Sequence, residues 1–229
     1  VNRGETQNRW ELKAHALRPF YRSLSHWSIF LNNPATYGWK DNVGSVPPIN
    51  VRIHEVPMTD EQEAIAQRLT GTLCINGIGG IMSRSKLSQL AKGTFDGEDV
   101  PTNKPQFIRD LVNGFGDAST LIWCIYNHEQ ASMESVFPDA ASIGGDTGEC
   151  DRYDLVKECQ SGRRKILISK PKVLGFGLNL QVFTRMVFSG IQDSFESYHQ
   201  AVKRANRYGS TDPLDVHIPV TEIERPMLE

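Results

Sequence analysis

The chain has 229 residues and a formal net charge of −2 at pH 7, with 39% hydrophobic and 23% charged residues. This composition is typical of a globular domain and excludes a low-complexity chain or one that is basic throughout. The length fits one large domain or two small ones. No apolar run approaches a membrane span, the first residues lack the apolar core of a signal peptide, and the missing initiator Met predicts a piece of a longer chain.

The first 103 residues predict a lead-in, a linker and the start of a folded lobe. The expected elements are a helix over 5–33, a linker over 34–48, a strand over 49–56, a helix from Thr59, a helix over 83–92 and a loop over 93–103. Apolar residues at helical spacing favour the first helix, and alternating apolar and polar residues favour the strand. Thr59, followed by acidic residues and Gln62, is typical of a helix N-terminus.

From residue 104 onward, helices and strands alternate. The expected helices span 106–115, 128–136, 149–160 and 194–206, and the expected strands span 120–126, 140–143, 165–169, 185–189 and 214–220. This alternation predicts an α/β fold, in which a parallel sheet is covered by helices on both faces. Ligands of such sheets bind at the carboxyl ends of the strands. We expect the loop after Ser169 and the helix that carries residues 200–207 to lie there.

Gln200, Arg204 and Arg207 are spaced at i, i+4 and i+7, which places them on one stripe of a helix. The guanidinium fork fits phosphate oxygens, so the stripe suits a polyphosphate. The competing interpretation is the solvated face of an amphipathic helix. Residues 161–210 carry a net charge of +7, which leaves −9 for the rest of the chain. This distribution favours a dedicated anion site over chance clustering.

Gly175 and Gly177 form a G-x-G sequence that is followed by Asn179. Such a turn lets a phosphate or sugar approach the backbone, and it is equally compatible with a tight turn before the next strand. The Walker A pattern G-x-x-x-x-G-K-[ST] does not occur, and no acidic pair follows a hydrophobic strand to hold magnesium. The chain alone is therefore not expected to hydrolyse a nucleoside triphosphate.

The sequence predicts neither a metal site in this chain nor a hydrolase of the Ser/His/Asp type. The four cysteines form no C-x-x-C pair, the six histidines are scattered, and no G-x-S-x-G sequence occurs. With no secretory signal, we expect reduced thiols and a cytoplasmic location.

Three strings, in order along the chain, resemble motifs four, five and six of superfamily-two helicases in the Swi/Snf-type branch. They are Leu121–Tyr126, Ile168–Leu180 and Gln200–Gly209. The sequence Asp193–Gln200 is most similar to phage or prophage DNA helicases. The resemblance implies the second RecA-like lobe of a motor: a helical lead-in and linker over 1–48, a strand with a helical insertion over 49–103, and the lobe itself over 104–229.

The resemblance also implies roles for ten residues. Arg207 matches the arginine finger and Arg204 the first arginine of motif six, whereas Gln200, Gly175, Gly177 and Asn179 match positions that face ATP, whose magnesium the first lobe would hold. Ser169, Lys170, Lys172 and Asn127 match positions that contact the phosphates of a DNA strand. The implied partners are DNA, duplex or single-stranded, and the first lobe of the same chain. The implied setting is a cytoplasmic protein of bacterial or phage origin with no membrane partner.

Two other functions fit parts of the sequence. One is a non-catalytic nucleic-acid-binding or scaffold module that keeps a helicase-like lobe, although intact Gln200, Arg204 and Arg207 argue against degeneration. The other is the nucleotide-sugar lobe of a glycosyltransferase, where the arginine stripe near the C-terminus is less expected. The chain differs from the usual motif six of the helicases that it resembles at two positions: Asn206 stands where a His is common, and Ser210 stands where a Gln is usual. A Walker A loop upstream of residue 1 would discriminate among the three.

Overall fold

The structure is a computed structural model that describes residues 2–3, 10–11, 14–28, 38, 46–76, 81–174, 178–190 and 194–227. The chain divides into two compact units, residues 1–44 and residues 45–229.

The first unit contains a short strand pair and one helix. β1 (Asn2–Arg3) pairs antiparallel with β2 (Trp10–Glu11), and a 3₁₀ turn leads into α1 (Leu17–Leu24). The prediction of one helix over 5–33 is wrong at β2, and residues 29–33 lie outside the described residues. None of the residues of α1 is buried. Because helices in proteins are stabilised mainly by packing of an apolar face, a helix without a buried face stays short.

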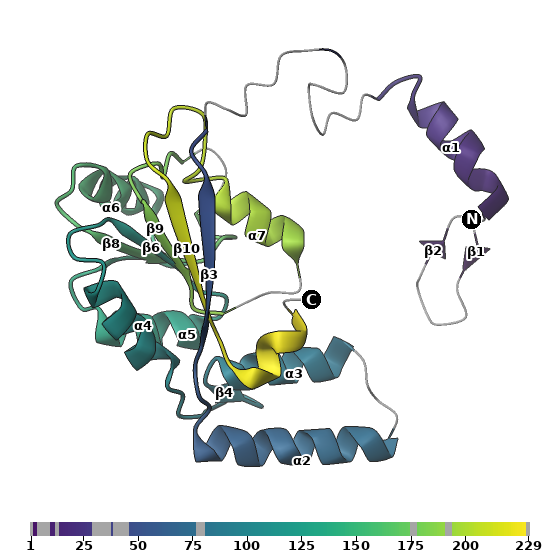
Figure 1. Cartoon of the computed structure of the whole chain (residues 1–229), viewed down its shortest axis with the longest axis horizontal. Coiled ribbons are helices and arrows are strands. Elements are labelled where there is room, and N and C mark those ends of the chain that lie inside the picture. The colour runs from purple at the N-terminus through teal and green to yellow at the C-terminus, as the bar shows by residue number, and fades with distance from the viewer. Residues whose placement is uncertain are drawn as a thin grey trace. The chain divides into compact units, whose positions relative to one another are not determined.

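The second unit is built on six parallel strands in the order β3-β10-β9-β6-β8-β7 (Figure 1). The strands are β3 (Ile49–Glu55), β6 (Thr120–Trp123), β7 (Ala141–Ile143), β8 (Ile166–Ser169), β9 (Arg185–Phe188) and β10 (Leu214–Val220). Each predicted strand is present, most of them one to three residues shorter than expected. The predicted α/β class is confirmed.

Helices cover both faces of this sheet. They are α4 (Lys104–Asn113) and α5 (Asn127–Val136) on one face, and α6 (Glu149–Gln160) and α7 (Phe195–Val202) on the other. Consecutive strand residues point to opposite faces: Leu121 belongs to the core with α6 and α7, and Ile122 belongs to the core with α4 and α5. Burial on both faces explains why these strands are apolar without alternation.

The edge strand β3 is less buried than its alternating sequence predicts. Val51 and Ile53 are 51% and 53% exposed. All seven residues of β3 pair in register with β10. Backbone pairing to one neighbour therefore holds β3 more than burial of a face does.

Residues 56–103 form an insertion with two helices, α2 (Asp60–Asn76) and α3 (Ile81–Ala91). The predicted start of α2 is confirmed by a capping box. The backbone N–H of Gln62 donates to Oγ1 of Thr59 at 3.3 Å, and the backbone N–H of Thr59 donates to Oε1 of Gln62 at 3.1 Å. Nε2 of Gln62 also donates to the carbonyl of Leu90 at 2.7 Å, which joins α2 to the end of α3.

The prediction of a loop over 93–103 is wrong in its first half. β4 (Thr94–Phe95) and β5 (Glu98–Asp99) form a small hairpin. Its two turn residues, Asp96 and Gly97, have φ of 49° and 90°. Two positive φ values define a type I′ turn, for which Asp-Gly is a strong sequence signal that the composition argument missed.

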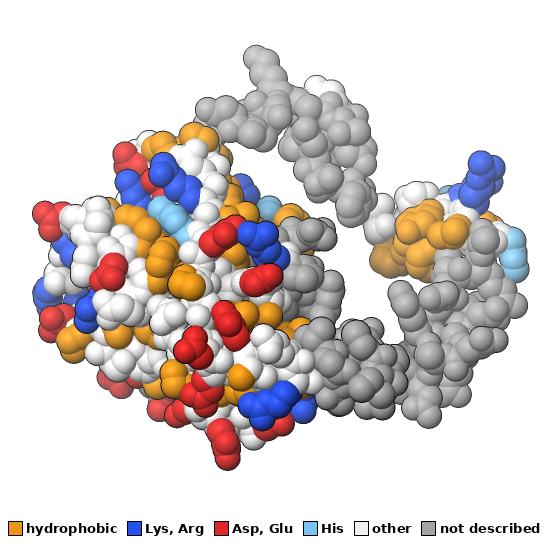
Figure 2. All heavy atoms as spheres, turned by 60° about the horizontal axis from the view of Figure 1, so that its bottom comes forward, with side chains coloured by type: hydrophobic (Ala, Val, Ile, Leu, Met, Phe, Trp, Pro, Cys, Tyr) orange, Lys and Arg blue, Asp and Glu red, His pale blue; other side chains and the backbone are white. Residues whose placement is uncertain are grey.

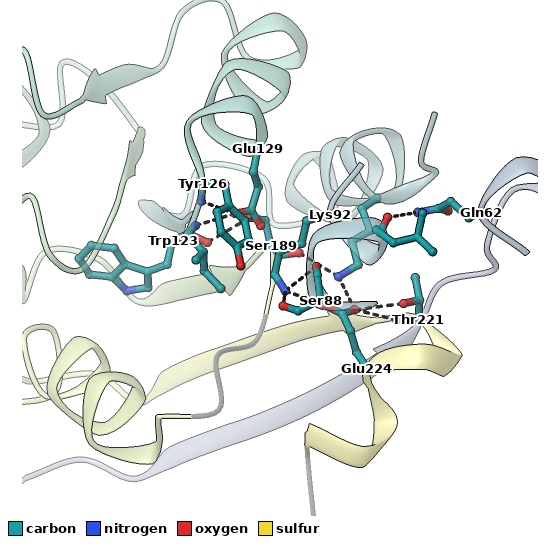
Figure 3. A network of polar contacts seen from close by, with 12 residues as sticks. Gln62, Ser88, Lys92, Trp123, Tyr126, Glu129, Ser189, Thr221 and Glu224 are labelled. Atoms are coloured by element: carbon teal, nitrogen blue, oxygen red, sulfur yellow. Dashed lines mark hydrogen bonds and ion pairs between the residues drawn. The ribbon is translucent and has the colours of Figure 1, made fainter. Parts of the chain in front are cut away.

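A buried ionic network joins this insertion to the carboxyl ends of the strands (Figure 3). Glu224, in the 3₁₀ helix η4 (Glu222–Met227), lies 2.5 Å from Nζ of Lys104 and 3.2 Å from Nζ of Lys92. All three side chains are at most 3% exposed. Burial alone would raise the pKa of Glu224, but the two lysines outweigh it and hold this pKa below its ordinary value.

The network continues to the turn that precedes α5. Nζ of Lys104 donates to the carbonyl of Ser189 at 3.1 Å, and Oγ of Ser189 donates to Oε1 of Glu129 at 2.5 Å. Oε2 of Glu129 accepts the backbone N–H groups of Ile125 at 2.5 Å and Tyr126 at 3.1 Å. The buried carboxylate of Glu129 thus fixes the first turn of α5, and with it the position of Asn127.

We expect Gly190→Ala to lower the free energy of unfolding by about 1–3 kcal/mol, because this glycine packs against the network. A Cβ at this position would lie 1.9 Å from Cε of Lys92 and 2.9 Å from Oε1 of Glu129. Gly145→Ala is a matched control, since a Cβ there has no neighbour within 4 Å. Urea unfolding measures both variants, and equal midpoints for the two would contradict this packing.

The free energy of unfolding is also expected to fall as the pH decreases from about 6.5 to 4. In this range protonation of His217 would disrupt its contact with His54, which joins β10 to β3. Nε2 of His54 lies 2.9 Å from Nδ1 of His217, a contact that requires one ring to accept and therefore to be neutral there. Burial, then His54, lowers the pKa of His217 from 6.5 to about 4. The unfolded chain therefore binds protons first as the pH falls, and the loss is on the order of 2 kcal/mol.

Urea unfolding at several pH values tests this loss. His217→Phe keeps an aromatic ring in the stack and removes the titrating group, so its unfolding midpoint should depend less on pH over the same range. Parallel pH profiles for the two proteins would contradict a role for His217.

Candidate functional site

Two residues predicted to contact a nucleic-acid strand meet at the carboxyl edge of the sheet. Asn127 begins α5 after β6, and Lys170 follows β8, which is paired with β6. Nζ of Lys170 donates to Oδ1 of Asn127. The sequence placed both side chains after strands without indicating that the strands are neighbours. Their contact with a nucleic acid stays a prediction.

Ser169 is placed differently from these two. It is fully buried, and its Oγ donates to the carbonyl of Ile143 on β7 at 2.9 Å. Its hydroxyl therefore ties two strands together and does not face solvent in this conformation. Lys172, in contrast, is exposed three residues further along. Among the residues predicted from the loop after β8, the two lysines are the ones available to a ligand.

The loop after β8 is fixed by two arginines, Arg152 of α6 and Arg204, which follows the end of α7. Nη2 of Arg204 donates to the carbonyl of Pro171 at 3.1 Å, and Nη1 of Arg152 donates to the carbonyl of Val173 at 3.0 Å. Arg204 also lies over the ring of Trp123, 5.9 Å from its centroid. Burial lowers the pKa of Arg204, which remains charged because guanidinium does not deprotonate in proteins. Its Nη1 is buried and has no hydrogen-bond partner in the described part of the chain.

The predicted stripe of Gln200, Arg204 and Arg207 on one helix is wrong. α7 ends at Val202. The backbone N–H groups of Arg204 and Ala205 bond three residues back, to the carbonyls of Ala201 at 3.3 Å and Val202 at 3.2 Å. Gln200 alone of the three lies in the helix, where its Nε2 donates to Oε1 of Glu196 at 3.0 Å. Arg204 turns inward and Arg207 lies in the following turn, so the two guanidinium groups do not share a helical face.

Long-range contacts end the helix early. Asn206 is buried, and its Nδ2 donates to the carbonyl of Pro47 at 2.8 Å. In the next turn, Oγ of Ser210 accepts the backbone N–H of Arg207 at 3.2 Å and donates to the carbonyl of Ala205 at 3.0 Å. Gly209, with φ of 91°, allows the chain to reverse. The family departures Asn206 and Ser210 thus have structural roles at this helix end.

Gln181 connects two of the predicted nucleotide-facing residues, Asn179 and Arg207. Its backbone N–H donates to Oδ1 of Asn179 at 3.0 Å, and its Nε2 donates to the carbonyl of Tyr208 at 2.9 Å. Nε2 also lies 3.5 Å from the carbonyl of Arg207. Sequence reasoning missed Gln181, since residues so far apart in the chain give no local signal of contact.

Arg207 does not lie at the carboxyl edge, where we expected the arginine helix. α7 starts after β9 and ends beside Pro47, which precedes β3, so its end lies at the amino edge of the sheet (Figure 1). Arg207 is exposed, and its side chain makes no hydrogen bond or ion pair to the residues that the structure describes. The predicted residues therefore form two groups: Asn127 and Lys170 at the carboxyl edge, and Asn179 and Arg207 toward the amino edge.

The remaining predicted residues, Gly175 and Gly177, lie outside the described residues. The described residues on either side of them are Leu174 and Leu178. Leu174 belongs to the core formed with α6 and α7, and Leu178 packs against it. Their predicted role near a nucleotide stays a prediction.

A cavity of about 430 Å³ opens at the carboxyl ends of β3 and β10, away from all of these residues. Its polar lining is acidic apart from Arg225, which pairs with Glu55. Several acidic side chains are visible together on the face shown in Figure 2. Because polyphosphates are repelled by carboxylates, this cavity does not fit a nucleotide.

Two absences concern the residues that the structure describes: a metal-binding cluster and a membrane-spanning helix. They contain no cluster of His, Cys, Asp and Glu that could hold a metal ion. None of the described helices is both long and apolar enough to cross a membrane.

Residues 103–209 match the helicase conserved C-terminal domain. This helicase-type segment runs from the start of α4 to the turn after Arg207, and it contains all ten residues singled out from the sequence. No curated protein sequence matches the chain.

Solved structures share the fold of the second unit. The C-terminal part of the Fun30 ATPase domain is 14% identical, with a TM-score of 0.64, and the match covers 80% of this chain and 89% of that one. The C-terminal domain of the Sulfolobus solfataricus SWI2/SNF2 ATPase is 15% identical, with a TM-score of 0.56 and coverage of 78% and 85%. The second unit therefore has the RecA-like fold of helicase C-terminal domains, as predicted.

The SWI2/SNF2 ATPase core of Sulfolobus solfataricus in complex with double-stranded DNA is also similar. It is 18% identical, with a TM-score of 0.61, and the match covers 76% of this chain and 41% of that core. The likeness is thus to less than half of the larger core. At these identities the comparison concerns the fold.

Proposed function

We propose that the chain is the second motor lobe of an ATP-dependent DNA helicase or translocase of the Swi/Snf type. The helicase-type segment and the RecA-like fold support the class. The observation that carries the proposal is the placement of Arg207, whose exposed guanidinium makes no hydrogen bond or ion pair within the described part of the chain and is therefore free for an anion. Free guanidinium groups on a RecA-like lobe suit the terminal phosphate of a nucleotide.

In this proposal the lobe holds half of an ATP site. Arg207 would stabilise the charge that develops on the transferred phosphoryl group. Arg204, whose Nη1 is buried in this conformation, would have to turn outward to bind the same phosphate. ATP is the substrate, and its phosphoryl transfer to water supplies the free energy for movement. A finger delivered from a separate lobe makes hydrolysis depend on closure of the two lobes. Magnesium and the phosphate-binding loop would belong to the first lobe.

The DNA-binding role is proposed for the carboxyl edge. Lys170 and Lys172 offer two cations beside Asn127, and side chains of these types bind phosphate oxygens without reading the sequence. Arg204 connects this edge to the arginine turn through the carbonyl of Pro171. DNA bound at the lysines could thus bias the position of the arginines. The assignment to a bacterial or phage-encoded cytoplasmic protein is part of the same proposal and rests on the sequence resemblance.

ATP hydrolysis by the full-length protein tests this function. We expect hydrolysis to be stimulated by DNA, and parallel assays with single-stranded DNA, duplex DNA and RNA identify the preferred strand. The isolated chain of residues 1–229 should show no turnover. Clear ATP hydrolysis by the pure isolated chain, or a full-length protein that does not respond to nucleic acid, would contradict the proposal.

A further inference from the structure

In the loop that carries Lys170 and Lys172, three backbone carbonyls accept hydrogen bonds: those of Lys170, Pro171 and Val173. The carbonyl of Lys170 accepts the N–H of Val173 at 2.9 Å and of Leu174 at 3.3 Å, which closes one tight turn. The side chain of Leu174 is 1% exposed and anchors the end of this turn in the core. Two further carbonyls of this loop, those of Pro171 and Val173, accept hydrogen bonds from Arg204 and Arg152.

Arg152 binds two loops at once. It lies in the first turn of α6, with its Nη1 3.0 Å from the carbonyl of Val173 and its Nη2 3.2 Å from the carbonyl of Thr147. Thr147 belongs to the loop after β7, where its Oγ1 accepts the N–H of Gly144 at 2.8 Å. Because β7 and β8 are neighbours, Arg152 joins the two adjacent loops at the carboxyl edge of the sheet.

We infer that Arg152 is a positioning residue for nucleic-acid binding, which holds the loop after β8 so that Lys170 and Lys172 face a strand in fixed positions. The inference rests on the proposed function. The guanidinium is planar and carries several donors in a fixed arrangement, so one side chain serves both carbonyls. A lysine has a single nitrogen on a flexible chain and cannot hold both carbonyls in the same geometry.

The loop after β8 is held at two points, one on each side of Lys172. Arg204, at the end of α7, fixes the loop at Pro171, on one side of Lys172, and Arg152 fixes it at Val173, on the other side. Lys172 is exposed between these two fixed points. Loss of Arg152 would free one side of the lysine without removing any residue that is proposed to contact a ligand.

The test uses the full-length protein with Arg152→Met and Arg152→Lys. Lys157→Met, an exposed cation on the same helix, is the matched control. The assay measures ATP hydrolysis against the concentration of a duplex or single-stranded oligonucleotide, at several salt concentrations. For Arg152→Met we expect the oligonucleotide concentration for half-maximal stimulation to rise about 5- to 10-fold, with the maximal rate within about twofold of the parent.

The salt dependence gives a second readout. If Lys170 and Lys172 lose defined phosphate contacts, the slope of log binding constant against log salt should become shallower by about one to two. Arg152→Lys should recover part of the affinity, and Lys157→Met should behave like the parent protein.

Three outcomes would overturn the inference. Arg152→Met with unchanged half-saturation but a lower maximal rate would indicate a reduced folded fraction, which thermal unfolding of the same sample would show. Half-saturation equally raised in Lys157→Met would indicate a general effect of charge. If hydrolysis by the parent protein does not respond to any nucleic acid, the proposed function itself is wrong. This outcome is distinguished from failure of the Arg152 inference because it is seen in the parent protein without any variant.

Discussion

Replacing Arg207 by Ala in the full-length protein is expected to reduce DNA-stimulated ATP hydrolysis by about 10³-fold or more, while leaving DNA binding nearly intact. The exposed side chain makes no hydrogen bond or ion pair within the described part of this lobe, so its removal should not change the fold. Its free guanidinium is available to a phosphate held by the first lobe. Steady-state hydrolysis at saturating DNA measures the loss, and equilibrium binding of a labelled oligonucleotide measures the retained affinity.

Arg163→Ala is a suitable control for this prediction. Arg163 is an exposed arginine within the same basic window, and its contact is an ion pair at 3.4 Å to Glu158 on the surface. Its removal should change hydrolysis by less than about twofold, because exposed ion pairs contribute little. Turnover of Arg207→Ala near that of the parent protein would show that another residue supplies the positive charge.

Replacing Glu224 by Ala is expected to lower the free energy of unfolding by about 3–5 kcal/mol, since it leaves Lys92 and Lys104 buried without a counter-charge. The carboxylate contacts both ammonium groups and also accepts the backbone N–H of Thr221 at 3.0 Å. Glu222→Ala removes an exposed carboxylate from the same 3₁₀ helix and should cost less than about 0.5 kcal/mol. Chemical unfolding of both variants gives the comparison.

The same argument predicts a partial rescue. Replacing Glu224, Lys92 and Lys104 together by Met removes the whole ionic group and fills its volume with apolar atoms, which in other buried ion groups is neutral or stabilising. The triple variant should therefore be more stable than Glu224→Ala alone. A loss of less than about 1 kcal/mol in Glu224→Ala would show that the two lysines find other acceptors or lose their protons.

Local sequence determined much of the second unit. The predicted bounds of the helix at 149–160 and of the strand at 214–220 agree with the structure to the residue. Gly148 and Gly162 lie at the two ends of the helix and Pro213 precedes the strand, and these residue types interrupt regular structure through their own backbone preferences. The buried strands were equally clear, because a parallel sheet covered on both faces requires continuous apolar runs.

The errors concern contacts between distant segments. The end of α7 depends on Asn206 bonding to Pro47, 159 residues away, and on Gln181 bonding to Tyr208. Spacing alone favoured a longer helix, since nothing local ends it before Gly209. The stripe predicted for Gln200, Arg204 and Arg207 is therefore wrong in its geometry, and the functional role of these residues stays a prediction. Both arginines follow the end of α7. Arg204 binds the loop after β8, and Arg207 lies in the turn before β10.

Some residues had no signal in the sequence. Arg152 lies in a helix of mixed charge, and Glu224 lies in a short segment after the last strand. Their importance depends on which loops the sheet order brings together, and the order of strands in a parallel sheet is not readable from apolar periodicity.

The pairing of β3 with β10 has a consequence for the order in which the protein folds. β10 is the last strand in the chain, and it lies between β3, the first strand of the sheet, and β9. β3 therefore has no strand partner until residues 214–220 are available, since paired residues of the two strands are 165 positions apart in the chain. Such distant pairing is slow to form. Until it forms, β3 and one side of β9 present unpaired backbone edges, which are the parts of this sheet most exposed to aggregation during folding.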